Sequence, residues 1–148
     1  MLGHFPTGVT VVTAAGEGGP TGVAIGSFAS ISLDPPLVGF FLGNQSSSGT
    51  VIEAAATSVS TSSPPINSNC AARWRRNRQT SSPMSSGPRR RPPAPLCSAN
   101  IVGHIDCDLE RIVELGDHNL IVGRVRALEV GEHKQPMVFF TGQYGTFG

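Results

Sequence analysis

The 148-residue sequence is poor in charged residues, and several of its features are notable for their absence. Only 14% of the residues are charged, while 39% are hydrophobic. No run approaches 18 consecutive apolar residues, so we expect no membrane span and no membrane partner. The first residues contain neither a charged segment nor an apolar one, which argues against a secretory signal peptide. A cytoplasmic location is therefore expected.

Metal and disulfide sites are also disfavoured. The three cysteines, Cys70, Cys97 and Cys107, show no CxxC spacing, so neither a zinc site nor a disulfide framework is expected. The histidines at 4, 104 and 133 share no common spacing either, and no metal is predicted. The length suits a single domain, 1–148, that is large enough to bury its own core.

The net charge of +1 conceals an asymmetry. Between Thr57 and Ser98 there are seven arginines and no acidic residue, whereas the rest of the chain has four basic and ten acidic residues. Serine and proline make up 17 of the 42 residues in this window, and large aliphatic residues are rare there. Such a composition buries too little apolar surface to offset the entropy of ordering. The window therefore separates two pieces with ordered patterns, 1–55 and 99–148.

Both flanking pieces have the patterns of antiparallel β-structure. Short β-branched or alternating segments are bounded by glycine, proline and aspartate, as is typical of strands and turns. The predicted strands are 8–14, 21–32, 37–42, 101–110, 120–125 and 136–141, with a short helix at 50–55. In the segment 101–110, apolar or small residues alternate with polar ones, which indicates a strand with one solvent-exposed face. About six short strands without helical alternation predict a mainly β fold, an antiparallel barrel or sandwich.

Four motifs, in the same order along the chain, resemble the flavin reductase domain family. They are HFPTGVTVVT at 4–13, SFASISLDPPLV at 27–38, GDH at 116–118 with IVGRV at 121–125, and PMVFF at 136–140 with Gly142 and Tyr144. The resemblance covers about 100 residues. It implies an antiparallel FMN-binding split β-barrel with short helices and an NAD(P)H-dependent reduction of FMN or FAD. It also implies a homodimer and a partner flavin-dependent monooxygenase that receives the reduced flavin.

The resemblance assigns one extended segment to the flavin. Its members are Ala24, Ile25, Ser27, Ser30 and Ser32, whose backbone N–H groups and hydroxyls would meet the pyrimidine edge and the ribityl chain. The alternative is that these serines only occupy the polar face of a strand. A second group, Asn44, Ser46, Ser47 and Ser48, lies at the predicted helix start, where N–H groups and the helix dipole favour a phosphate. An ordinary helix cap explains the same residues equally well.

Three further residues have a functional and a structural interpretation. In the family, the histidine that matches His118 lies beside the flavin and helps receive the nicotinamide, although a lone surface histidine is usually uninformative. Tyr144 would either cover the flavin or merely close the barrel. Cys107 alternates with apolar residues and is predicted to be a core residue rather than a nucleophile.

The window 56–97 departs from the family, which has a strand and a helix there. Suppose that one base was lost near Ala55–Ala56, so that the window is read in a shifted frame. In the original frame, the codons now read as serine would encode Phe, Leu, Ile or Val, and those now read as threonine would encode Tyr, His, Asn or Asp. Residues 57–63, TSVSTSS, then decode as HFCVNVL, and the shifted frame continues through Ser82 as an amphipathic helix with acidic residues. Our hypothesis is a double frameshift that closes near Cys97. Resequencing the gene tests it.

Two other functions remain open. One is a non-catalytic flavin-binding module with the same barrel, and the other is a defective product of a frameshifted gene. The arginine clusters at 73–78 and 89–91 also invite a nucleic-acid interpretation. The shifted frame explains these arginines without a ligand, so no nucleic-acid partner is predicted.

Overall fold

The computed structural model describes residues 2–16, 19–46, 49, 52, 59–62, 102–131 and 135–146. These residues form almost entirely β-strands, after a 3-10 turn η1 at Leu2–His4. The strands are β1 (Thr7–Gly8), β2 (Thr10–Gly16), β3 (Gly19–Ile25), β4 (Ala29–Leu33), β5 (Pro36–Gly43), β6 (Val59–Ser62), β7 (Gly103–Leu115), β8 (His118–Val130), β9 (Met137–Phe140) and β10 (Gln143–Thr146).

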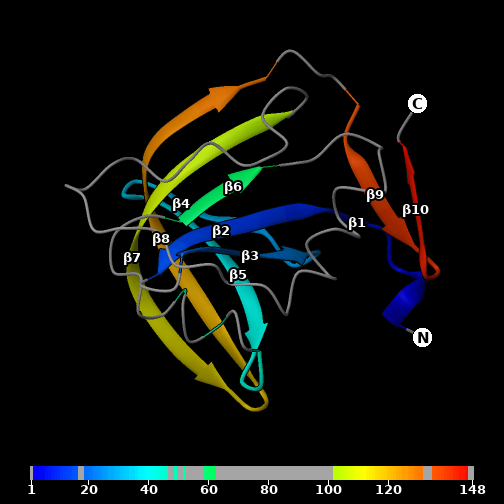
Figure 1. Ribbon diagram of the computed structural model, residues 1–148, viewed down its shortest axis with the longest axis horizontal. Coiled ribbons are helices and arrows are strands. Elements are labelled where there is room, and N and C mark those ends of the chain that lie inside the picture. Colours follow the sequence, from blue (N-terminus) through cyan, green and yellow to red (C-terminus); the bar gives the residue numbers. More distant parts are fainter. Residues whose placement is uncertain are drawn as a thin grey trace.

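The strands belong to two sheets, and every recorded strand pair is antiparallel (Figure 1). The larger sheet has the order β3-β2-β6-β7-β8-β5-β4 and curls strongly, while the smaller sheet has the order β1-β9-β10. Both chain ends lie beside the smaller sheet. The predicted mainly β split barrel is therefore confirmed.

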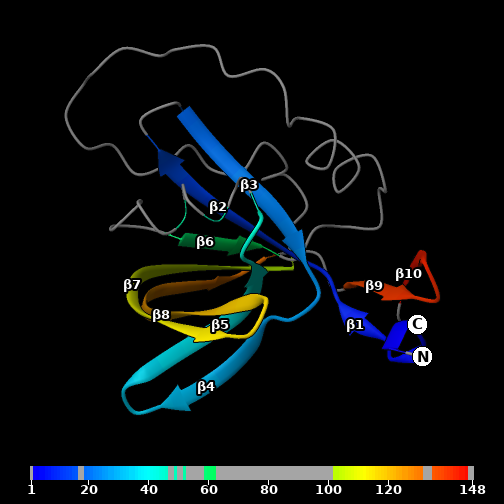
Figure 2. The same ribbon diagram turned by 90° about the horizontal axis from the view of Figure 1, so that it is seen from below.

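The barrel is split between β3 and β4. These two strands follow each other in the chain, yet they are the two edges of the seven-stranded sheet. Figure 2 shows β2 and β3 diverging from the layer that contains β4 and β5. The short segment at 26–28 therefore crosses from one edge of the sheet to the other instead of continuing a strand.

The sequence predicted one strand over 21–32, and this prediction was wrong, because contacts with distant segments interrupt the strand at 26–28. A Cβ atom on Gly26 would lie only 2.6 Å from the Thr7 side-chain oxygen, so the close approach of β1 demands a glycine there. One residue later, the Ser27 hydroxyl accepts a hydrogen bond from the Phe41 backbone N–H at 3.0 Å. The chain thus turns away from β3 and is held against β5.

Two apolar clusters hold the fold together. The main cluster fills the curled sheet and includes Val12, Ala14, Ile25, Phe40, Leu42, Ile52 and Ile121. The second cluster, Val9 and Met137, joins the two sheets, because Val9 lies between β1 and β2 and its N–H donates to the Met137 carbonyl at 3.0 Å. The helix predicted at 50–55 lies outside the described residues except for Ile52, which is helical and fully buried.

The β7–β8 hairpin is the longest element pair. β7 begins at Gly103, two residues after the predicted start at 101, and continues past the predicted end at 110, whereas β8 extends the predicted strand 120–125 at both ends. Each strand has 13 residues, joined by Gly116 and Asp117. Cys107 is 2% exposed, so the core assignment is confirmed, and burial together with the neighbouring Asp106 and Asp108 raises the pKa of its thiol to about 12. The polar side of β7 is only partly exposed to solvent, because the His104 and Asp106 side chains are largely covered, with His104 Nε2 lying 3.3 Å from Asp106 Oδ1.

The turn between β9 and β10 offers a stabilising substitution. Thr141 and Gly142 both have positive φ, 46° and 82°, which is the pattern of a type I′ hairpin turn. A β-branched side chain is disfavoured there, whereas asparagine is common. We expect Thr141→Asn to raise the free energy of unfolding by about 1 kcal/mol, measured by urea denaturation. The control is Thr10→Asn in the extended strand β2, which should not stabilise; equal effects of both changes would contradict the turn argument.

Candidate active site

The end of β5 and the turn between β7 and β8 are far apart in the sequence but meet at one end of the barrel. Gly43, the last residue of β5, is the register partner of His118, the first residue of β8. Asn44 follows and donates twice to the β7–β8 turn, from its backbone N–H to the Asp117 carbonyl at 3.0 Å and from Nδ2 to the Gly116 carbonyl at 3.1 Å. These bonds fix the position of His118 relative to the end of β5.

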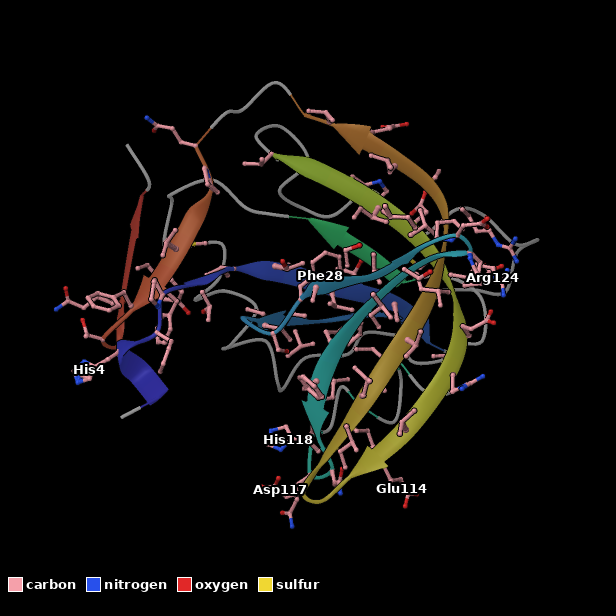
Figure 3. All side chains as sticks on the ribbon, turned by 180° about the vertical axis from the view of Figure 1, so that it is seen from behind. His4, Phe28, Glu114, Asp117, His118 and Arg124 are labelled. Atoms are coloured by element: carbon pink, nitrogen blue, oxygen red, sulfur yellow. The ribbon has the colours of Figure 1, made fainter. Side chains whose placement is uncertain are left out.

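The His118 side chain is oriented by its neighbour Asp117. Its Nδ1 lies 2.7 Å from Asp117 Oδ1, and the imidazole is 49% exposed (Figure 3). The hydrogen bond with His118 and the charge of the ring lower the pKa of the Asp117 carboxyl. With Nδ1 occupied, the second ring nitrogen is left for a ligand. A Cβ on Gly43 would lie 3.8 Å from Nε2, at ordinary contact distance, so Gly43 borders this nitrogen.

The structure gives Ser27 a structural partner. Its hydroxyl accepts from the Phe41 N–H at 3.0 Å and lies 3.4 Å from the Phe41 carbonyl, to which it can donate. Ser27 lies two residues before Ala29, where β4 begins, so these contacts extend the pairing with β5 on that side. The role of Ser27 in flavin binding stays a prediction, and any flavin contact would share a hydroxyl that already holds β5.

A β-bulge separates the two other serines of this segment. Ser30 is the register partner of Val38, whereas Ser32 is the partner of Leu37, and the register shifts between the two serines. Val38 and Leu37 are consecutive residues of β5 and point to opposite faces, and register partners share a face. The bulge therefore puts Ser30 and Ser32 on opposite faces of β4. Ser30 is exposed and shares its face with buried Val38. A flat ligand on one face would therefore meet only one of these two hydroxyls.

Ala24, Ile25 and Tyr144 lie in different surroundings. Ile25 belongs to the main core and is 9% exposed. Ala24 and Tyr144 both pack against the Val9–Met137 cluster, and the Tyr144 ring lies 5.1 Å from that of Phe139. The structure thus brings Ala24 and Tyr144 together at the junction of the two sheets and places Ile25 apart from them.

The predicted phosphate segment is described only in part. The Ser46 N–H donates to the Gly43 carbonyl and the Gly49 N–H donates to the Ser46 carbonyl, both at 2.9 Å, so these two donors are used by consecutive turns. Asn44 is likewise committed to the β7–β8 turn. Ser47 and Ser48 lie outside the described residues. Their assignment to a phosphate stays a prediction.

The residues present fit a flavin in two respects. Ser30 offers an exposed hydroxyl beside the split edge of the barrel, and the ring nitrogen of His118 is accessible at the end of the neighbouring strands. The sequence analysis missed the contribution of Asp117, which orients His118. The signal was available, because an acidic residue directly precedes this histidine in the GDH motif.

Comparisons with known proteins identify the family of this chain. The family model described as a flavin reductase like domain matches residues 2–148. The chain is 36% identical to a flavin-dependent monooxygenase reductase subunit, HsaB, of Rhodococcus jostii, covering 97% of this chain and 73% of that protein. It is 37% identical to a flavin reductase of Pseudomonas putida, covering 99% of this chain and 86% of that protein.

A solved structure is similar over nearly the whole chain. It is the Streptomyces globisporus NADH:FAD oxidoreductase SgcE6 in complex with NAD and FAD fragments, with a TM-score of 0.81, 31% identity, and coverage of 99% of this chain and 88% of that one. Among the described residues, no helix is long and apolar enough to cross a membrane. The family match and these similarities confirm the resemblance of the four motifs: the chain belongs to the flavin reductase family and is an oxidoreductase.

Proposed function

We propose that this chain uses NADH or NADPH to reduce FMN or FAD. The observation that carries the proposal is the Asp117–His118 pair, held at the end of β5 by Asn44, in a chain of the flavin reductase family. Bound flavin supplies an N5 atom that accepts hydride from the nicotinamide C4, so the protein contributes position and electrostatics rather than an acid–base pair.

Each site residue then has a distinct part. His118 would help to receive the nicotinamide through Nε2, and Asp117 holds the imidazole through Nδ1 so that Nε2 stays available. Ser30 on β4, and Tyr144 and Ala24 at the junction of the sheets, would hold the flavin. The relatives named as monooxygenase reductase subunits support a partner monooxygenase that uses the reduced flavin. The enzyme works in the cytoplasm.

A homodimer is part of the proposal. The face of β4, β5, β8 and β7 that is turned away from the core, called here the outer face, carries large apolar side chains. Ile31, Phe41 and Leu115 on it are 47%, 44% and 49% exposed. Exposed apolar side chains on neighbouring strands are typical of a surface that another protein covers, and we assign this one to a second copy of the chain.

The test of the hydride-transfer role is His118→Ala. We expect the KM for NADH to rise about tenfold, because a hydrogen bond to the nicotinamide is lost, while the flavin dissociation constant changes less. Steady-state NADH oxidation with added FMN measures the first quantity, and flavin fluorescence quenching measures the second.

The control is His4→Ala, because His4 lies on η1, far from His118 (Figure 3). Its KM should match that of the wild type. Unchanged NADH kinetics in flavin-loaded His118→Ala would remove His118 from the site. A wild-type chain that binds flavin but oxidises no NADH would instead indicate a non-catalytic flavin-binding module.

A further inference from the structure

The turn between β7 and β8 is held by a residue from outside the hairpin. Gly116 and Asp117 form this two-residue turn, in which Gly116 has a φ of 66°. The Gly116 carbonyl accepts a hydrogen bond from Asn44 Nδ2 at 3.1 Å, and the Asp117 carbonyl accepts one from the Asn44 backbone N–H at 3.0 Å. Turns at the end of a hairpin are ordinarily among the more mobile parts of a sheet. Asn44 therefore restrains this turn at two consecutive peptide groups.

Asn44 lies just past the end of the ladder between β5 and β8. Gly43 and His118 are the final register pair of that ladder. The Ser46 N–H donates to the Gly43 carbonyl at 2.9 Å, so the chain turns directly after β5. The Asn44 side chain thus extends the contact between β5 and the hairpin past the point at which the strand pairing stops.

The restrained turn carries the two side chains of the candidate site. Figure 3 shows Asp117 and His118 at the tip of the β7–β8 hairpin. Asn44 binds the carbonyl of Asp117, and the carboxylate of the same residue lies 2.7 Å from His118 Nδ1. The imidazole is 49% exposed, so packing alone restrains it weakly. A displaced turn would therefore carry the carboxylate and the imidazole with it.

The same hydrogen bonds leave Asn44 little to offer a phosphate. Its donors are the backbone N–H and the NH₂ group of the side-chain amide. The turn uses the backbone N–H and one hydrogen of the NH₂ group. The remaining side-chain atom, Oδ1, is an acceptor and would repel a phosphate oxygen. The contacts of Asn44 thus favour a role in the turn over the phosphate role predicted from the sequence.

We infer that Asn44 is a positioning residue, which sets the Asp117–His118 pair toward the nicotinamide and does not hold the flavin phosphate. The inference rests on the proposed function and adds to it the residue that orders the nicotinamide side of the site. Asn44 acts on NADH through His118 without contacting the dinucleotide. Loss of the Nδ2 hydrogen bond should therefore weaken the use of NADH and leave recognition of the flavin phosphate unchanged.

Two substitutions separate positioning from phosphate binding. Asn44→Ala removes the Nδ2 donor and keeps the backbone bond, while Asn44→Asp keeps the shape but replaces the donor with a charged acceptor. Each should raise the KM for NADH about three- to tenfold, the effect of one lost hydrogen bond. Fluorescence quenching measures the dissociation constants of FMN and of riboflavin, which lacks the phosphate. Their ratio should change less than about threefold, whereas a carboxylate beside the phosphate would shift it about tenfold or more.

A double-mutant cycle tests whether Asn44 acts through His118. The KM for NADH is measured for His118→Ala with and without Asn44→Ala. Once the imidazole is gone, the Asn44 change should alter this KM by less than about twofold. The control Gln143→Ala removes an exposed amide from β10, which lies on the smaller sheet away from this turn, and should leave the KM unchanged (Figure 1). Thermal unfolding sets an assay temperature at which all variants are folded.

The possible failures are distinguishable. A wild type that oxidises no NADH, or a His118→Ala variant with an unchanged KM, would overturn the proposed function and the positioning role with it. If His118→Ala is impaired, an unchanged KM in both Asn44 variants or a fully additive cycle would overturn the positioning role alone. A selective loss of FMN binding over riboflavin binding would return Asn44 to the phosphate site.

Discussion

A chain in which residues 56–82 carry the shifted-frame sequence should be much more stable than the chain as written. The structure sharpens this expectation, because β6 is a strand and lies at an interior position of the seven-stranded sheet, between β2 and β7. Thr61 is the register partner of both Val12 and Ile105, and Ser60 is the partner of both Thr13 and Asp106. Val12 is fully buried and Thr13 is 8% exposed, so the neighbours of β6 belong to the interior.

The expected size follows from the residue types. As written, residues 57–63 contain a single aliphatic residue, Val59, whereas the shifted frame HFCVNVL supplies four large apolar residues at positions 58, 60, 62 and 63. Each large side chain that becomes buried contributes roughly 1.5–3 kcal/mol. A typical domain has a total stability of about 5–15 kcal/mol. The restored segment can therefore add a large fraction of the whole, and flavin binding should improve with it.

The written chain and the restored chain are both measured by thermal unfolding and by flavin-dependent NADH oxidation. A third chain, with only residues 57–63 replaced, separates the contribution of β6 from that of the following helix. Equal melting temperatures and equal activities of the written and restored chains would show that the window is a tolerated native insertion. A written chain without a cooperative transition would support the alternative that it is a defective product.

Ser30→Tyr should block flavin binding. Ser30 is exposed on a face of β4 next to the split edge, and a phenol ring there would fill the space predicted for the isoalloxazine edge. Steric exclusion of this kind costs roughly 1–3 kcal/mol, so we expect the flavin dissociation constant to rise about 10- to 100-fold. Titration by fluorescence quenching measures it.

The bulge provides the matched control for that experiment. Ser32→Tyr adds the same ring to the same strand, but on the opposite face, and should leave flavin affinity nearly unchanged. If only Ser32→Tyr weakens flavin binding, the flavin lies on the face of β4 that carries Ser32 and not on the face that carries Ser30. Undiminished affinity in both variants would show that β4 does not border the flavin.

The sequence by itself determined the elements whose pattern is local. Residues 37–42 are a continuous apolar run, and the structure has β5 there because this strand pairs with β4 on one side and β8 on the other. The alternation at 101–110 predicted β7, and the buried position of Cys107 followed from it. The four motifs identified the family, since short segments in a fixed order suffice for that purpose.

Only the tertiary structure decided how these elements divide and meet. The break at Gly26 depends on Thr7, and the bulge that separates Ser30 from Ser32 depends on the pairing of β4 with β5. The position of His118 depends on Asn44, a residue 72 positions before Gly116, to which its side chain donates. Each of these is a contact between distant segments, which propensity and periodicity within one segment do not encode.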